Sequence, residues 1–95
     1  MQVKQRFQAV FSNLQAWQEL AQQRPHYNHN IRWDSEDKHY YLCDNECVMF
    51  MDITGITVQS NLADTLHDCC NVHFALDELE DAYNFFCSVS SEEPM

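Results

Sequence analysis

The segment from His39 to Val58, HYYLCDNECVMFMDITGITV, restricts the fold more than any other part of the chain. It is rich in β-branched and aromatic residues, which favour strands. Asx and glycine residues at Asp44–Glu46 and Thr54–Gly55 interrupt it, and such residues tolerate the left-handed backbone of tight turns. An earlier run, Asn30–Asp34, reaches this segment through Ser35–Asp37. We therefore predict a four-stranded antiparallel meander.

Loop lengths set the register of this predicted sheet. Three-residue loops place Cys43 opposite Cys47 and Trp33 opposite His39, and a Thr54-Gly55 turn pairs Ile53 with Ile56. Because side chains alternate across a strand, one face then collects the expected core. Its members are Ile31, Trp33, Tyr41, Cys43, Cys47, Met49, Met51, Ile53, Ile56 and Val58.

The opposite face of the predicted sheet is polar at its margins but apolar in the middle, at Tyr40, Leu42, Val48 and Phe50. A sheet with one solvated face is normally polar there. We therefore expect a helix or another protein to cover these four side chains, and an uncovered apolar patch would mark an interaction site. A register shift of one residue would exchange the two faces.

Helical periodicity frames the sheet on both sides. Residues 3–23 form a predicted helix that ends before Pro25, and its apolar stripe is Val3, Phe7, Val10, Phe11, Leu14, Trp17, Leu20 and Ala21. After the sheet, we predict a short helix at Leu62–Cys70 with Asn71 as its C-cap. A last helix covers Leu76–Val89, with Leu76, Leu79, Ala82, Tyr83, Phe86 and Val89 facing inward. The predicted fold is α+β, ordered α-β-β-β-β-α-α, in one domain of residues 1–95 with a frayed tail at about 90–95.

The N-terminus, MQVKQRFQAV, contains no continuous apolar run, so we expect no signal peptide and no transmembrane span. The five cysteines are odd in number and lack a secretory context, which predicts reduced thiols. The expected location is therefore the cytoplasm, without a membrane partner.

Charge is distributed unevenly along the chain. Residues 1–33 carry a formal charge of +3 and residues 34–95 carry −13, within a net charge of −10. This balance argues against direct binding of nucleic acid, which needs clustered basic residues. It permits occupation of a basic surface on another protein, where DNA would otherwise lie, although it also suits an ordinary solvated surface. The candidate partner-binding acids are Asp64, Asp68, Asp77, Glu78, Glu80 and Asp81.

Some residues are of types that could carry chemistry. Cys43 and Cys47, together with His67, Cys69, Cys70 and His73, are of zinc-ligand types, but their spacing departs from the usual paired short motifs. We therefore predict no metal or cofactor and keep a small zinc module as a third hypothesis. The single glycine, Gly55, is needed for a turn, which excludes glycine-rich phosphate loops. Without an evident oxyanion site or catalytic arrangement, we predict that the chain is not an enzyme.

A small, acidic, glycine-poor α+β chain of this kind is similar in general character to phage anti-CRISPR and anti-restriction proteins and to toxin-immunity proteins. The similarity involves no defined motif. It implies a non-enzymatic inhibitor, such as a DNA mimic, that binds a basic, nucleic-acid-handling protein. The alternative is a homodimeric structural or adaptor domain that pairs through Tyr40, Leu42, Val48 and Phe50. The two hypotheses are compatible, because an inhibitor can be dimeric.

Overall fold

The computed structural model describes residues 3–24, 30–44, 47–60 and 70–90. Helices and an antiparallel sheet make up this part of the chain, so the predicted α+β class is confirmed. In chain order the elements are α1 (Val3–Gln22), β1 (Arg32–Asp34), β2 (His39–Asp44), β3 (Cys47–Asp52), β4 (Gly55–Ser60), β5 (Cys70–Phe74), the 3-10 helix η2 (Leu76–Glu78) and α2 (Leu79–Ser90).

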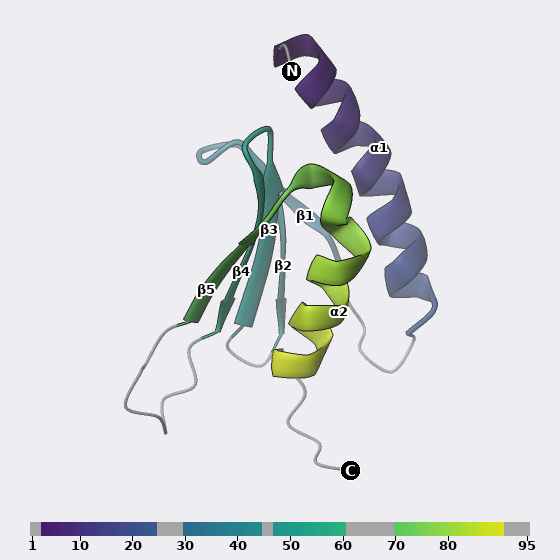
Figure 1. Cartoon of the computed structure of the whole chain (residues 1–95), viewed down its shortest axis with the longest axis vertical. Helices are drawn as coiled ribbons and strands as arrows, with labels where there is room; N and C mark the ends of the chain where they lie inside the picture. The colour runs from purple at the N-terminus through teal and green to yellow at the C-terminus, as the bar shows by residue number, and fades with distance from the viewer. Residues whose placement is uncertain (1–2, 25–29, 45–46, 61–69, 91–95) are drawn as a thin grey trace.

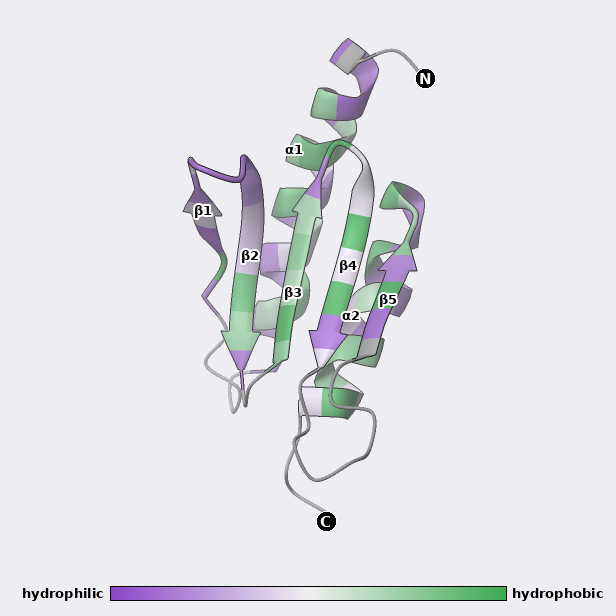
Figure 2. Cartoon of the chain, turned by 90° about the vertical axis from the view of Figure 1, so that its left-hand side faces the viewer, coloured by the Kyte–Doolittle hydropathy of each residue, from purple (hydrophilic) through white to green (hydrophobic). Residues whose placement is uncertain are grey.

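The sheet has five strands in the order β1-β2-β3-β4-β5, so every strand pairs with its neighbour in sequence. Helices α1 and α2 pack against each other on the same side of this sheet (Figure 1). In the view turned by 90°, the sheet lies in front and both helices lie behind it (Figure 2). We call the side toward the helices the helix face and the opposite side the open face. Neither described helix covers the open face.

The fifth strand corrects the sequence prediction of four. The predicted helix Leu62–Cys70 falls on residues outside the described part, except for Cys70, which begins β5. Asn71 lies inside this strand and is not a helix cap. Strand β5 pairs with β4, with Phe74 opposite Ile56. Its sequence, CNVHF, alternates in polarity as a strand at the surface requires, with Phe74 packed against the core.

The predicted register of β2 against β3 is wrong by one residue. Asp44, and not Cys43, lies opposite Cys47, and Leu42 lies opposite Met49. Leu42 is consequently 1% exposed on the helix face, whereas Cys43 is exposed on the open face. A leucine removes more apolar surface from water than a cysteine does, so this register places the larger side chain in the core.

This shift divides the predicted apolar patch between the two faces. Val48 and Phe50 lie on the open face, as predicted, but Tyr40 and Leu42 lie on the helix face, where Tyr40 packs against the core. Tyr41, which the sequence placed in the core, lies instead on the open face opposite Phe50.

The hairpin between β1 and β2 has a four-residue loop, 35–38, instead of the predicted three residues. The carboxylate of Asp34 accepts hydrogen bonds from the backbone N–H groups of Glu36 (2.9 Å) and Asp37 (3.2 Å). Lys38 closes the turn in the left-handed conformation, with a φ of 58°. The extra residue places Trp33 opposite Tyr40, and their ring centroids are 4.8 Å apart.

The turn between β3 and β4 is at Ile53-Thr54, one residue before the predicted position. Asp52 lies opposite Gly55, and its carboxylate accepts a hydrogen bond from the Thr54 N–H at 2.8 Å. The pairing is displaced by two residues, which leaves the faces unchanged. The predicted core positions Met49, Met51, Ile56 and Val58 are accordingly all 0% exposed.

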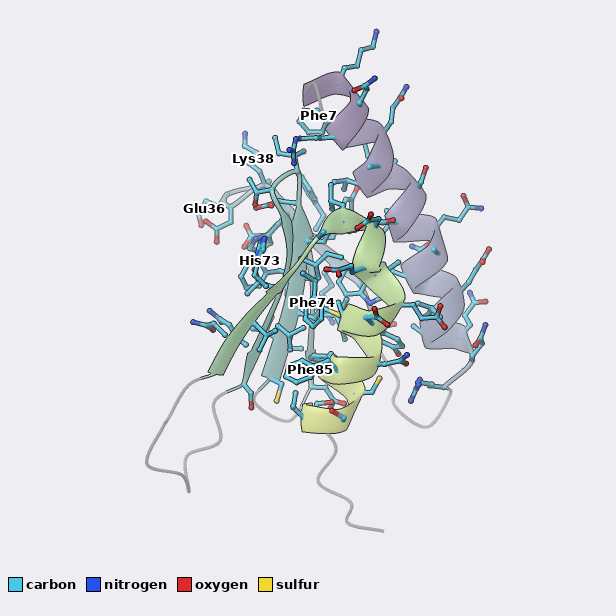
Figure 3. All side chains as sticks on the ribbon, in the orientation of Figure 1. Phe7, Glu36, Lys38, His73, Phe74 and Phe85 are labelled. Atoms are coloured by element: carbon cyan, nitrogen blue, oxygen red, sulfur yellow. The ribbon has the colours of Figure 1, made fainter. Side chains whose placement is uncertain are left out.

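Helix α1 confirms the predicted helix but only part of its buried stripe. Trp17 is 0% exposed and Val10 is 5% exposed, and Leu14, Leu20 and Ala21 are partly buried against the core. The side chain of Val3 is not among those that the structure describes. Phe7 and Phe11, predicted to be buried, are 48% and 59% exposed. The first turns of α1 extend past the end of the sheet, where Phe7 is seen, so the described strands offer the Phe7 side chain little to pack against (Figure 3).

The predicted last helix is confirmed as η2 followed by α2. Its buried residues include Leu76, Leu79, Ala82, Tyr83 and Phe86, which were predicted, and Cys87, which was not. The Glu78 carboxylate accepts a hydrogen bond from the Ala75 N–H at 2.9 Å and so satisfies a donor at the start of the helix.

Candidate functional site

Four of the six predicted partner-binding acids lie together at the start of the last helix. Asp77, Glu78, Glu80 and Asp81 are all exposed, in η2 and in the first turn of α2. Asp64 and Asp68 lie outside the described residues. Within the described ranges, no lysine or arginine forms an ion pair with any of the four. Since the positive end of a helix favours negative charge, their accumulation here is compatible with folding.

Two of these acids line a groove that the sequence did not predict. The groove lies between α1 and the η2–α2 segment and has a volume of about 280 Å³. Glu19 from α1 contributes a third carboxylate beside Asp77 and Glu80. We call it the acidic groove; its lining residues are Asn13, Ala16, Glu19, Leu20, Gln23, Leu76, Asp77, Leu79 and Glu80.

Both walls of the acidic groove are held by side-chain hydrogen bonds. The Asn13 amide donates to the Leu76 carbonyl at 2.5 Å, which ties α1 to η2. Just after α1, the Arg24 guanidinium donates to the Asn84 side-chain oxygen at 3.0 Å and lies 5.6 Å from the ring centroid of Tyr83. Arg24 is thus engaged with α2 outside the groove lining, and the described residues of the lining include no lysine or arginine.

The sequence carried a partial signal for the missed residue, Glu19. Asn13, Ala16, Leu20 and Gln23 follow helical spacing along one side of α1, and Glu19, the only acid of this helix, borders that line. What the sequence could not show was which side of α1 packs against the last helix.

The open face is the second candidate surface. Tyr41, Val48 and Phe50 are partly exposed near its centre, with Arg32 at one edge and His73 at the other. The ring of His39 stacks on Phe50 with a centroid distance of 4.9 Å and approaches Tyr41 edge-on at 6.0 Å. This face therefore combines aromatic rings with polar margins. Its residues are Arg32, Asp34, His39, Tyr41, Cys43, Val48, Phe50, Asp52, Thr57, Gln59, Asn71 and His73.

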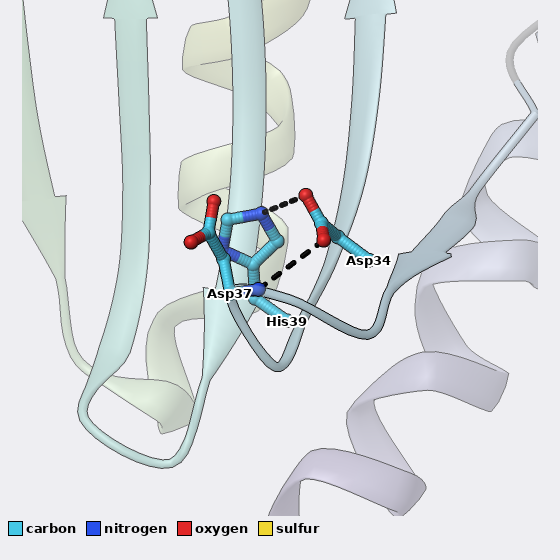
Figure 4. Close-up of side chains that lie close together, drawn as sticks. All are labelled: Asp34, Asp37 and His39. Atoms are coloured by element: carbon cyan, nitrogen blue, oxygen red, sulfur yellow. Dashed lines mark hydrogen bonds and ion pairs between the residues drawn. The ribbon is translucent and has the colours of Figure 1, made fainter.

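Asp34, Asp37 and His39 come together at the β1–β2 hairpin (Figure 4). One possible ligand atom from each lies within 4.8 Å of the others, and Asp34 Oδ2 is 3.9 Å from His39 Nε2. Carboxylates and an imidazole are ligand types for several divalent cations. The bonds of the turn already explain the position of Asp34, however, so we assign no metal to this cluster.

The structure separates the first ligand pair of the zinc hypothesis. Cys43 lies on the open face, whereas Cys47 is buried on the helix face with its Sγ 3.6 Å from Ser60 Oγ. Cysteines on opposite faces of a sheet cannot bind one ion or form a disulfide without rearrangement of the strands. His67 and Cys69 lie outside the described residues.

His73 and Thr57 form a hydroxyl–imidazole pair on the open face, with Oγ1 and Nδ1 3.1 Å apart. Figure 3 shows His73 and Phe74 on opposite sides of the sheet. Catalysis by such a pair needs a third group to orient the imidazole. No carboxylate fills that role among the residues that the structure describes.

Cys87 is buried between α2 and the sheet at 3% exposure. Burial raises the pKa of its thiol above the ordinary value of 9.0, an effect that a hydrogen bond with Tyr83 and the charge of Arg24 partly offset. It is therefore a packed core residue rather than an activated nucleophile.

Comparison of the chain with protein-family models, with curated proteins and with solved structures gives no match. Among the described helices, none is long and apolar enough to cross a membrane. The candidate functions consequently rest on the surfaces described above.

Proposed function

We propose that the chain is a non-enzymatic inhibitor that binds a basic, nucleic-acid-handling protein through the helical side of the fold. One observation carries this proposal: Asp77, Glu78, Glu80 and Asp81 are exposed together, and no described lysine or arginine neutralises them. Unpaired surface charges of one sign attract a surface of the opposite sign and accelerate its association. Phage anti-CRISPR and anti-restriction proteins and toxin-immunity proteins act as blocking proteins of this kind.

The test is capture of partners from a bacterial lysate on the immobilised chain, followed by elution with salt and, separately, with DNA. We expect a basic nuclease, CRISPR complex or toxin that is released as the salt concentration rises, because screening weakens contacts between exposed charges. DNA should displace the same protein if both occupy one surface. The captured protein should also lose its activity when the purified chain is added.

A charge-reversed variant locates the interaction. Asp77→Lys, Glu80→Lys and Asp81→Lys together should abolish capture, whereas Glu78 is retained because it accepts the Ala75 N–H. Unchanged capture and inhibition by this variant would contradict the proposed surface. Circular dichroism of both proteins serves as the folding control.

A second candidate function, a homodimeric structural or adaptor domain, is favoured by the open face. Five strands of three to six residues span at most roughly 24 by 20 Å. Two such faces in contact would bury on the order of 1,000 Å², which is near the lower limit for a specific interface. The expected dimer is therefore weak and dependent on concentration.

Sedimentation equilibrium over a range of concentrations tests this second candidate. Phe50→Asp should give a folded monomer, and Gln59→Asp on the same face should weaken the dimer without removing a large side chain. Gln15→Asp, which adds the same charge on exposed α1, is the matched control. A wild-type protein that remains monomeric at all concentrations would remove the candidate.

A further inference from the structure

The acidic groove offers two kinds of surface side by side. Leu76 and Leu79, which are 9% and 6% exposed, and the partly buried Leu20 provide apolar walls. Glu19, Asp77 and Glu80 are exposed carboxylates around the same space of about 280 Å³. The apolar walls distinguish this groove from a simple cluster of surface acids.

This combination matches the chemistry of an arginine side chain. The alkyl stem of arginine packs on apolar surface while its charged end remains near water. Its planar guanidinium carries five N–H donors and binds carboxylates with directional, charge-assisted hydrogen bonds. Carboxylates from both walls could accept these donors, and the side-chain oxygens of Asn13 and Gln23 are further acceptors in the lining.

Among the described residues, no basic side chain of the protein itself occupies the position proposed for an arginine. No lysine or arginine stands among the lining residues that the structure describes, and Arg24, the arginine that follows α1, bonds to Asn84 and lies against Tyr83. The hydrogen bond between Asn13 and Leu76 joins the two walls, so the space exists before a ligand enters. Preorganisation of this kind reduces the cost of binding.

We propose that the acidic groove between α1 and η2–α2 receives an arginine side chain from the basic protein partner. The inference rests on the proposed function and deepens it, because it names the group that the partner contributes. The groove supplies the specific contact, and the surrounding acids supply general attraction.

The experiment uses the full ¹⁵N-labelled chain, titrated with a blocked tetra-arginine peptide and with a blocked tetra-lysine peptide. Amide shifts should concentrate on the groove-lining residues, and the arginine peptide should bind more tightly. The groove variant Glu19→Gln/Glu80→Gln removes one carboxylate from each wall. The matched control Glu36→Gln/Asp37→Asn changes two exposed acids outside the groove and outside the acidic start of the last helix, and both variants change the net charge from −10 to −8.

We expect the groove variant to bind the arginine peptide roughly tenfold more weakly and the control variant to bind it less than about threefold more weakly. Equal weakening of both variants would overturn the inference, because net charge alone would then explain binding. Equal affinity for the lysine peptide would overturn the assignment to arginine.

Capture from lysate separates this inference from the proposed function. If the groove variant captures a basic, salt-released partner as well as wild type does, the inference fails and the function stands. If wild type captures no such partner, the proposed function fails whatever the peptides do.

Discussion

Substitution of Gly55 by alanine should strongly destabilise the protein, because the register of the sheet depends on this residue. Gly55 has a φ of 140°, a conformation that residues with a side chain rarely adopt. A Cβ atom at this position would lie 2.8 Å from the Phe74 backbone oxygen and 2.5 Å from Nε2 of His73. Both neighbours belong to β5, so the substitution tests the contact between β4 and the strand that the sequence did not predict.

The magnitude follows from two contributions. Backbone strain at this φ costs about 1–3 kcal/mol, and overpacking against β5 costs about 1–3 kcal/mol more. A loss of about 2–6 kcal/mol is a large part of the roughly 5–14 kcal/mol expected for a domain of this size. The melting temperature should fall by about 10–30 °C.

Urea denaturation followed by circular dichroism measures the change, in wild type, Gly55→Ala, His73→Ala and the double variant. Removal of the His73 ring should recover part of the lost stability, because the strain and the Phe74 oxygen remain. A loss below about 1 kcal/mol for Gly55→Ala would refute the reasoning. Complete recovery in the His73→Ala background would show that the backbone contributes nothing.

Three further predictions concern the described cysteine and tryptophan side chains. With a thiol reagent at pH 8, the exposed Cys43 should react rapidly, whereas the buried Cys47 and Cys87 should react only on unfolding. Peptide mapping by mass spectrometry identifies the labelled cysteines. Fast labelling of Cys87 would contradict its burial. Since the pKa of the Cys87 thiol is raised above 9.0 in the folded protein, its contribution to stability should be complete below pH 9.0. That contribution should be lost as the pH rises through the pKa of the folded state. In urea titrations at several pH values, Cys87→Ser should make this fall in the free energy of unfolding less steep. Acrylamide should quench the fluorescence of Trp33, 51% exposed, much more than that of Trp17, 0% exposed, and Trp33→Phe should leave only the protected emission.

The sequence predicted those parts of the fold in which apolar residues recur at regular spacing and face the same core. The apolar spacing of α1 and α2 and the alternation of Met49, Met51, Ile56 and Val58 all have this property, and those four side chains are buried as predicted. The alternation survives a displaced turn, because a shift of two residues leaves each side chain on its face.

The register errors arose at turns where hydrogen bonds to an aspartate carboxylate before the loop, and not the residues of the loop, determine the position of the turn. Asp34 and Asp52 accept hydrogen bonds from backbone N–H groups of the residues that follow them. The first loop is one residue longer than predicted, and the second turn lies one residue earlier. In β2, burial of Leu42 instead of Cys43 reverses the predicted faces. A difference of one residue in a loop is thus enough to relocate half of an apolar patch.

The candidate site was only partly predictable, because its parts come from distant segments. The helix-start position of Asp77 and Glu80 follows from sequence, and both line the acidic groove. Glu19 joins them only through packing of α1 on the last helix, which local pattern does not encode. The exposed state of Phe7 has the same origin, since it depends on how far α1 extends past the sheet.

The strict sequential order of the strands has a consequence for folding kinetics. Every strand pairs with the one before it, so the sheet can form from local hairpins with little loss of loop entropy. Helix α1 is different, because the bonds from Asn13 to Leu76 and from Arg24 to Asn84 span 63 and 60 residues. We therefore expect α1 to dock late, on a sheet already paired. The acidic groove, for which α1 forms one wall, then appears only at the last step, so a chain that has not finished folding has no groove with which to bind.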